Sequence, residues 1–294
     1  MGNDRSLNEI RTIPAIGAPL GRRATRGAAA VLILFGFATR CFAQAGPPYQ
    51  TDDPDPVPRH HVEAYVFELS DGTPAGTALV GPSVEINWGA APNLQLHLVI
   101  PFVTALSPGE TAQHGMGDIE IGAKYRLVKE TARVPEIGVF PFVELPAGDA
   151  SRGLGVGTTW YRLSVWIKKS VGSWNTYGGG GEVVVKADGF KNYSFASGLV
   201  QRKITDRLTL GGEVIGHGAE TSNPDEVGRA VRADFGGFYR VTPGFQLLFA
   251  AGHSIAWHPE TYTYFAVYWT WGKDDVSKAA DASTARSFSP LRHD

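Results

Sequence analysis

The sequence predicts an all-β protein that folds as a single antiparallel, up-and-down transmembrane β-barrel of about twelve strands. Three observations predict this fold. Charged and apolar residues alternate along segments of roughly ten to thirteen residues, the connections between segments alternate between long and short, and the N-terminus resembles an export signal. Strands of soluble proteins usually contain about 5–6 residues, whereas a tilted membrane strand needs about 9–11. The segment lengths therefore favour a membrane barrel over a soluble sandwich.

Residues 1–45 have the pattern of a cleaved signal peptide. A basic stretch at 22–26 precedes an uncharged, mostly apolar segment at 28–38, and Ala43-Gln44-Ala45 fits a small-x-small cleavage site. Cys41 follows Arg40, where a lipoprotein signal needs a small residue, so we expect no lipid anchor there. The signal predicts export and, with the barrel, an outer-membrane location in a Gram-negative-type envelope.

Residues 46–59 are predicted to form a periplasmic arm rich in proline and aspartate. The segment from Gln50 to Val57 contains three acids, Asp52, Asp53 and Asp55, as well as prolines. Proline lacks a backbone N–H and excludes both helix and interior strand, so the arm should be extended. Two interpretations remain open: a simple tether, or an arm that folds into the barrel or binds calcium through its acids.

Residues 60–272 form the predicted barrel. In the stretch from Gly117 to Leu127, the even-numbered positions carry two acids and then two bases, while the odd-numbered positions carry no charge. This period of two is that of a strand with one polar and one apolar face. The predicted strands are approximately 60–69, 78–88, 94–105, 117–129, 134–145, 157–169, 174–186, 192–203, 207–217, 229–241, 245–255 and 261–271.

The connections alternate nearly throughout. Long ones at 106–116, 146–156 and 218–228 are separated by tight turns such as Thr242-Pro243-Gly244. Outer-membrane barrels have long external loops and short periplasmic turns, so the alternation of connection lengths supports an outer-membrane barrel. Five tryptophans near predicted strand ends are expected to form interfacial girdles: Trp88, Trp160, Trp174, Trp257 and Trp271. Residues 273–294 are polar, lack periodicity and are predicted to be a disordered tail.

Charged residues on the predicted inner faces are the candidate lining of a solute path. Phe140, Phe142 and Leu248 are also expected to point inward, with Glu136 and Glu144. The alternative is that the charged residues only form ion pairs between strands and stabilise the barrel wall. The candidates are Glu85, His97, Asp118, Glu120, Lys124, Arg126, Arg162, Lys168, Glu182, Lys186, Glu213, Arg232, Asp234 and Arg240.

We predict no catalytic residue, no cofactor and no metal site. The glycines at 153–157 are not followed by the Lys-Ser/Thr of a phosphate loop, and they are expected in an external loop. His253 and Ser254 are adjacent and would point to opposite faces of a strand. The glycines at 178–181 leave room on the wall for the arm, a loop or a solute, or allow a bend. A lipid-modifying enzyme remains the catalytic alternative.

Four stretches resemble an outer-membrane β-barrel family named for the MetA pathway of phenol degradation. They are Thr51 to Pro54, Gly117 to Arg126, Leu145 to Gly157 and Trp174 to Gly181, and the resemblance covers most of residues 50–272. It implies a channel for passive diffusion of small organic solutes, including aromatic ones. Membrane lipid, such solutes and the barrel-assembly machinery are the expected partners. The net charge of −2 gives no reason to expect nucleic acid. A sealed structural or adhesive barrel and a secreted soluble sandwich remain alternatives.

Overall fold

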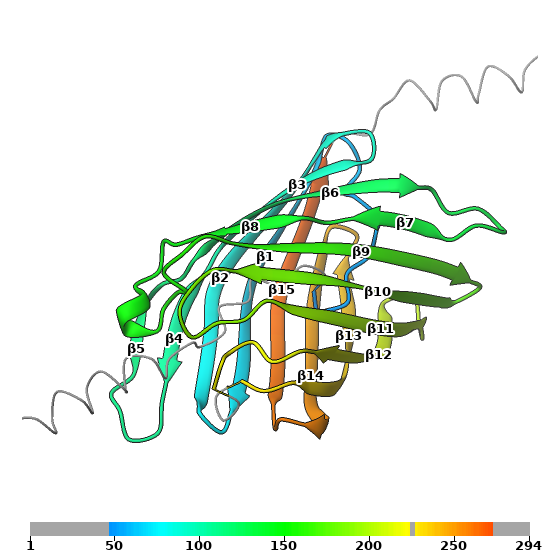
Figure 1. Cartoon of the computed structure of the whole chain (residues 1–294). Coiled ribbons are helices and arrows are strands. Elements are labelled where there is room, and N and C mark those ends of the chain that lie inside the picture. The colour runs from blue at the N-terminus through cyan, green and yellow to red at the C-terminus, as the bar shows by residue number, and fades with distance from the viewer. Residues whose placement is uncertain (1–46, 224–226, 273–294) are drawn as a thin grey trace, which may run out of the picture.

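The computed structural model describes residues 47–223 and 227–272, and these form one closed antiparallel barrel (Figure 1). The predicted signal peptide and tail lie outside the described residues. One short 3-10 helix, η1 (Ala150–Arg152), interrupts the strands, and no helix among the described residues is long and apolar enough to cross a membrane. The strands are β1 (His61–Thr73), β2 (Gly76–Ala91), β3 (Leu94–Ile100), β4 (Phe102–Leu106), β5 (Gln113–Met116), β6 (Ile119–Val128), β7 (Glu136–Val139), β8 (Phe142–Leu145), β9 (Trp160–Val171), β10 (Trp174–Val185), β11 (Tyr193–Lys203), β12 (Leu208–His217), β13 (Ala230–Thr242), β14 (Phe245–Trp257) and β15 (Thr261–Gly272).

These fifteen segments make twelve barrel strands because three strands are each divided in two. Pro101 separates β3 from β4, Gly117-Asp118 separates β5 from β6, and Phe140-Pro141 separates β7 from β8. Each proline removes a backbone donor from the ladder. The ladder is partly continued across the breaks: Gly117 N donates to the Pro101 carbonyl at 3.0 Å, and Ala123 N to the Pro141 carbonyl at 3.1 Å. The prediction of twelve strands is confirmed.

The first and last strands close the barrel. β1 pairs antiparallel with both β2 and β15, so that Val62 lies opposite Trp88 on one side and Trp271 on the other. Each barrel strand between them also pairs with its neighbours in the sequence, which confirms the up-and-down topology. Closure pairs each of the two end strands on both sides, which removes the free edges that lipid would not tolerate there.

The outer surface of the barrel is apolar. Ile121 and Tyr125 are exposed while Glu120 and Lys124, on the same strand, are buried inside, so the predicted register is confirmed there. Large apolar side chains are likewise exposed on the outward positions of β3, β9, β13 and β15. Four of the five girdle tryptophans are exposed, but the prediction for Trp160 is wrong. Its ring is 3% exposed and packs inward against Phe142.

The interior contains two aromatic and aliphatic clusters as well as charge. One gathers around Tyr65, Phe67 and Tyr264, and the other around Phe142, Trp166 and Phe195. Phe140, Phe142 and Leu248 point inward as predicted, and so do Glu136 and Glu144. In the glycine run of β10, a Cβ on Gly179 would lie 2.5 Å from Cε3 of Trp166, so this glycine makes room for the barrel's own tryptophan.

Candidate functional site

The N-terminal arm lies inside the barrel and is not a free tether (blue in Figure 1). Tyr49, Thr51, Asp52 and Val57 are almost completely buried. An extended segment rich in proline cannot pair with itself, so its backbone groups need partners on the wall. The Tyr262 hydroxyl donates to the Pro48 carbonyl at 3.1 Å, and the Val57 N–H donates to Gln95 Oε1 at 3.0 Å. The arm therefore crosses the interior from β15 to β3.

Glu213 on β12 holds the middle of the arm. Its carboxylate accepts the N–H of Gln50 at 3.0 Å and both the N–H and the hydroxyl of Thr51. The Thr51 hydroxyl also lies 2.7 Å from Ser197 Oγ on β11. A buried carboxylate is stable only when such donors replace water. Glu213, predicted as a lining residue, thus serves first as an anchor for the arm.

The three acids of the arm meet three bases of the wall. Lys124 Nζ lies 2.9 Å from Asp52 and 3.5 Å from Asp53. Asp55 lies 2.6 Å from Arg126 Nη1 and 3.1 Å from Lys168 Nζ. Lys124, Arg126 and Lys168 were predicted as lumen residues, and the structure brings all three together against the arm. The acids of the arm are thus paired with lysine and arginine side chains of the wall.

Charge pairing decides the ionisation of Asp55. Burial alone would raise the pKa of Asp55, but Lys168 and Arg126 outweigh burial and hold this pKa below its ordinary value. Arg126 also lies 3.4 Å from Glu136 on β7. The Asp55 carboxylate, which links the arm to the wall, is therefore ionised at neutral pH.

Glycines in the wall allow the arm to approach closely. A Cβ on Gly138 of β7 would lie 2.9 Å from Cβ of Pro54, and one on Gly211 of β12 would lie 3.0 Å from the Tyr49 hydroxyl. At Gly89 of β2, a Cβ would lie 2.6 Å from the Val57 carbonyl oxygen. These three glycines, rather than those at 178–181, accommodate the arm.

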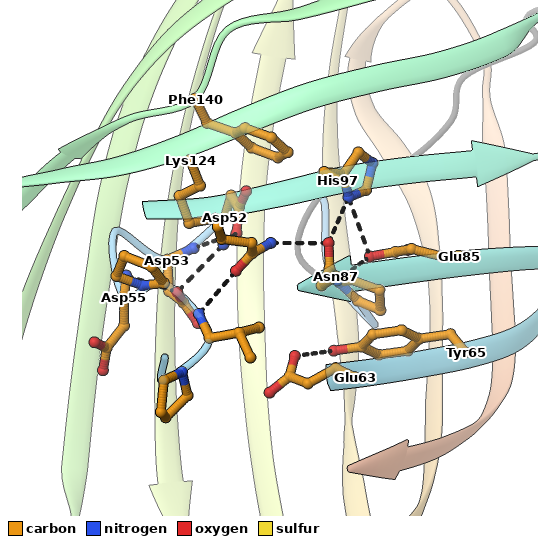
Figure 2. Close-up of a pocket in the computed structure, with 15 residues that line it drawn as sticks. Asp52, Asp53, Asp55, Glu63, Tyr65, Glu85, Asn87, His97, Lys124 and Phe140 are labelled. Atoms are coloured by element: carbon orange, nitrogen blue, oxygen red, sulfur yellow. Dashed lines mark hydrogen bonds and ion pairs between the residues drawn. The ribbon is translucent and has the colours of Figure 1, made fainter. Parts of the chain in front are cut away.

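A cavity of about 250 Å³ lies between the arm and the wall (Figure 2). The arm forms one side of it with its three acids and its prolines, and β1, β2, β3 and β6 form the other. Its polar and aromatic lining comprises Asp52, Asp53, Asp55, Glu63, Tyr65, Glu85, Asn87, Gln95, His97, Lys124 and Phe140. In this cavity, acids of the arm lie beside residues that the sequence predicted to line the interior.

Side chains of β2, β3 and β6 form a polar network behind this cavity. Asn87 donates to Glu85 Oε1 at 2.8 Å and accepts from Gln95 at 2.8 Å. His97 Nδ1 lies 2.6 Å from Asn87 Oδ1, and its Nε2 lies 2.5 Å from Glu120 Oε1. Figure 2 shows Glu85, Asn87 and His97 converging at one end of the cavity. Three predicted candidates, Glu85, His97 and Lys124, line the cavity directly.

Several other candidates make contacts that stabilise the barrel wall. Asp118 accepts the N–H groups of Gly148 at 2.9 Å and Val156 at 2.7 Å, so it fixes the loop that follows β8. Arg232 lies 2.8 Å from Asp234 and its guanidinium carbon lies 4.3 Å from the Tyr262 ring. The guanidinium carbon of Arg162 lies 4.0 Å from the Phe195 ring centroid. These contacts match the alternative that the charges stabilise the barrel.

Two candidates do not face the interior as predicted. Glu182 and Lys186 are exposed, while Val183 and Val185 between them are buried in the inner aromatic cluster. Glu182 accepts the hydroxyl of Ser194, which is also exposed. The prediction failed because the end of this strand is apolar on both faces, so charge alone could not set its register. Arg240 is exposed near the end of β13 and contacts the Asp206 carbonyl at 3.5 Å.

Sequence reasoning left several cavity residues out of the candidate list. Glu63 and Tyr65 were not singled out, and Asp52, Asp53 and Asp55 were considered only as acids of an arm that folds into the barrel or binds calcium, although all five line the cavity. A usable signal was present: the acids of the arm are matched by Lys124 and Arg126, two bases on one face of a single strand.

Comparison with solved structures supports the fold. An outer membrane channel from Pseudomonas putida F1 is 14% identical, with a TM-score of 0.61, and the match covers 74% of this chain and 98% of that one. The NanC porin is 10% identical, with a TM-score of 0.50, and the match covers 70% of this chain and 98% of that one.

No match was found among curated protein sequences. A sequence model of one family, however, matches residues 48–270, which include the arm from Pro48 and nearly all of the barrel. This is well over half of the 294 residues. The chain therefore belongs to the family described as "Putative MetA-pathway of phenol degradation".

Proposed function

We propose that the protein is an outer-membrane channel for the passive diffusion of small organic solutes, including aromatic ones. The observation that carries the proposal is the closed strand ring with apolar side chains outside and charged, hydrogen-bonded side chains inside. A water-soluble barrel would not expose Leu96, Leu163 and Phe235 on its outer wall, whereas lipid contact stabilises them. Export by residues 1–45 and insertion by the barrel-assembly machinery belong to this proposal.

The interior suits small solutes. Twelve strands lie between an eight-stranded barrel, which its side chains fill, and a sixteen-stranded porin with an open channel. The arm narrows the interior further, because it occupies the space between β12, β15 and β3. The inward aromatic rings offer a solute with a ring an apolar surface along the wall.

A sealed structural barrel is the second candidate. The observation that favours it is the burial of the arm, whose Tyr49 and Asp52 side chains are both 1% exposed. The two functions differ in permeability alone, since both require the same fold and location.

Liposome swelling separates the two candidates. The mature chain, residues 46–294, would be reconstituted into vesicles, and swelling would be followed in small neutral solutes of increasing size, with and without an aromatic ring. The proposal predicts swelling that falls steeply with solute size. No swelling by a folded barrel, including one that lacks residues 46–58, would favour the sealed barrel.

A further inference from the structure

We propose that the cavity between the arm and the wall binds a small organic cation, namely a primary ammonium group carried on a compact apolar body. This assignment adds a ligand site to the barrel. Ligand binding at this site does not require a solute to pass through the membrane. The proposed site can therefore be tested independently of the proposed channel function.

The cavity has an excess of acidic side chains. Five carboxylates line it, from Asp52, Asp53, Asp55, Glu63 and Glu85, against one lysine, Lys124. Lys124 is shared by Asp52 and Asp53, and Asp55 is neutralised by bases outside the cavity. His97 adds no free positive charge, because its Nε2 already contacts Glu120 at 2.5 Å. This excess of acids favours a cation as the ligand of the cavity.

Two carboxylate oxygens of residues that line the cavity are buried without a hydrogen-bond partner in the described part of the chain. Neither Glu85 Oε2 nor Asp52 Oδ2 has a hydrogen-bond donor among the described residues, and each of the two residues is only 1% exposed. Glu63, by contrast, accepts from the hydroxyls of Tyr65 at 3.2 Å and Tyr268 at 2.8 Å. A buried carboxylate oxygen without a donor is costly, and an ammonium group brings three donors. Glu85 and Asp52 are therefore the expected contacts of the ligand nitrogen.

Two aromatic rings in the lining fit an organic body. Tyr65 and Phe140 both line the cavity (Figure 2), and Lys124 Nζ already lies 5.3 Å from the centroid of Phe140. The Phe140 ring is thus placed to attract positive charge, as the faces of aromatic rings do. A volume of about 250 Å³ is below the roughly 300–1,000 Å³ of pockets for drug-sized ligands, so the ligand must be small.

The lining does not favour a metal ion or a phospholipid headgroup. Among residues 47–223 and 227–272, no group of three or more His, Cys, Asp or Glu side chains is arranged to hold a metal. A phosphoethanolamine headgroup carries the same ammonium, but its phosphate would be repelled by the excess carboxylates. A free amine with one positive charge is the ligand that the lining fits.

Calorimetric titration of the refolded mature chain in a non-ionic detergent at neutral pH tests the assignment. The probes are benzylammonium and its neutral counterpart benzyl alcohol. We expect benzylammonium to bind at least about ten-fold more tightly. Glu85→Gln keeps the size of the side chain and removes its charge, so it should weaken benzylammonium binding about ten-fold without changing the binding of benzyl alcohol. Glu182→Gln, on the outer surface, is the matched control and should bind like the parent chain.

Four results would overturn the assignment. They are equal affinity for benzylammonium and benzyl alcohol, an unchanged affinity in Glu85→Gln, tighter binding of calcium than of the amine, and stronger competition by phosphorylethanolamine than by methylammonium. A shift in gel mobility on heating shows whether each variant is folded. If Glu85→Gln does not fold, Asp52→Asn, which alters the arm and leaves the barrel wall intact, replaces it with the same expected loss.

Discussion

At the scale of single residues, docking of the arm depends on carboxylates that contact donors or bases across the boundary between the arm and the wall. Glu213 accepts donors from Gln50 and Thr51, and Asp55 contacts Arg126 and Lys168. The sequence predicted that Glu213 and the bases face inward, because they occupy the polar side of alternating strands. It could not predict their partners. Gln50 and Glu213 are 163 positions apart. The arm also has no alternating pattern from which its position against a strand could be predicted.

Removing the Glu213 carboxylate should loosen the arm. In Glu213→Ala, the buried donors of Gln50 and Thr51 lose their acceptor, and hydrogen bonds to charged groups contribute about 1.5–3 kcal/mol each. We expect the free energy of unfolding to fall by about 2–4 kcal/mol in urea titrations in vesicles. Glu182→Gln on the outer surface should change it little. An unchanged stability in Glu213→Ala would show that the arm is not anchored there.

The contact of Asp55 should make docking of the arm sensitive to acid. A carboxylate with a lowered pKa in the docked state stabilises docking above its free pKa of about 3.9, and this contribution is lost as the pH falls through the docked pKa. We therefore expect conductance to rise as the pH falls below about 4. Asp55→Asn lacks this titration and should show no such step. A step of equal size in Asp55→Asn would assign the effect to another group.

At the scale of elements, the sequence located all twelve strands to within a few residues, because period-two alternation survives along most of them. It did not locate the breaks at Pro101 and Phe140-Pro141, which lie within apolar runs. It also missed the register of β10, where Val183 to Val185 is apolar on both faces. Glycines such as Gly89 were not assigned to the arm, since their role depends on a distant segment.

A side chain at Gly89 should displace the arm and leave the barrel intact. In Gly89→Ala, the new Cβ would collide with the backbone of Val57 and Pro58, which cannot move aside as a flexible side chain can. We expect normal heat-dependent gel mobility together with a larger single-channel conductance. Gly216→Ala is the control, because its nearest neighbour is a side-chain atom of Val231 at 3.4 Å. Equal conductance in the two variants would contradict the docking of the arm at β2.

At the scale of the whole molecule, the barrel exposes apolar side chains outward and keeps charged side chains inward around a closed ring. This arrangement followed from the sequence because a slip of one residue would turn Asp118, Glu120, Lys124 and Arg126 outward. The sequence did not predict which side chains fill the interior. Inward aromatic residues such as Trp166 have the same hydrophobicity as outward ones, so only packing distinguishes them.

Charges placed on the outer wall should be costly in proportion to their depth. Val165 lies mid-strand and Val171 at the end of β9, and both are exposed. Val165→Lys should destabilise the barrel in vesicles by about 2–4 kcal/mol, and Val171→Lys by about 0–1 kcal/mol, because lysine is most costly at the bilayer midplane. Denaturant titration in lipid measures both values. Equal costs would argue against a membrane around β9.

Single-channel conductance in a planar bilayer is the most direct test of a channel narrowed by its own arm. The refolded chain 46–294 would be compared with a chain that lacks residues 46–58, each after a heat-dependent gel shift has established folding. We predict small discrete steps for the first chain and steps at least about two-fold larger for the second, because the arm crosses the interior and deleting it widens the path. Two folded barrels without steps, or with equal steps, would contradict the account.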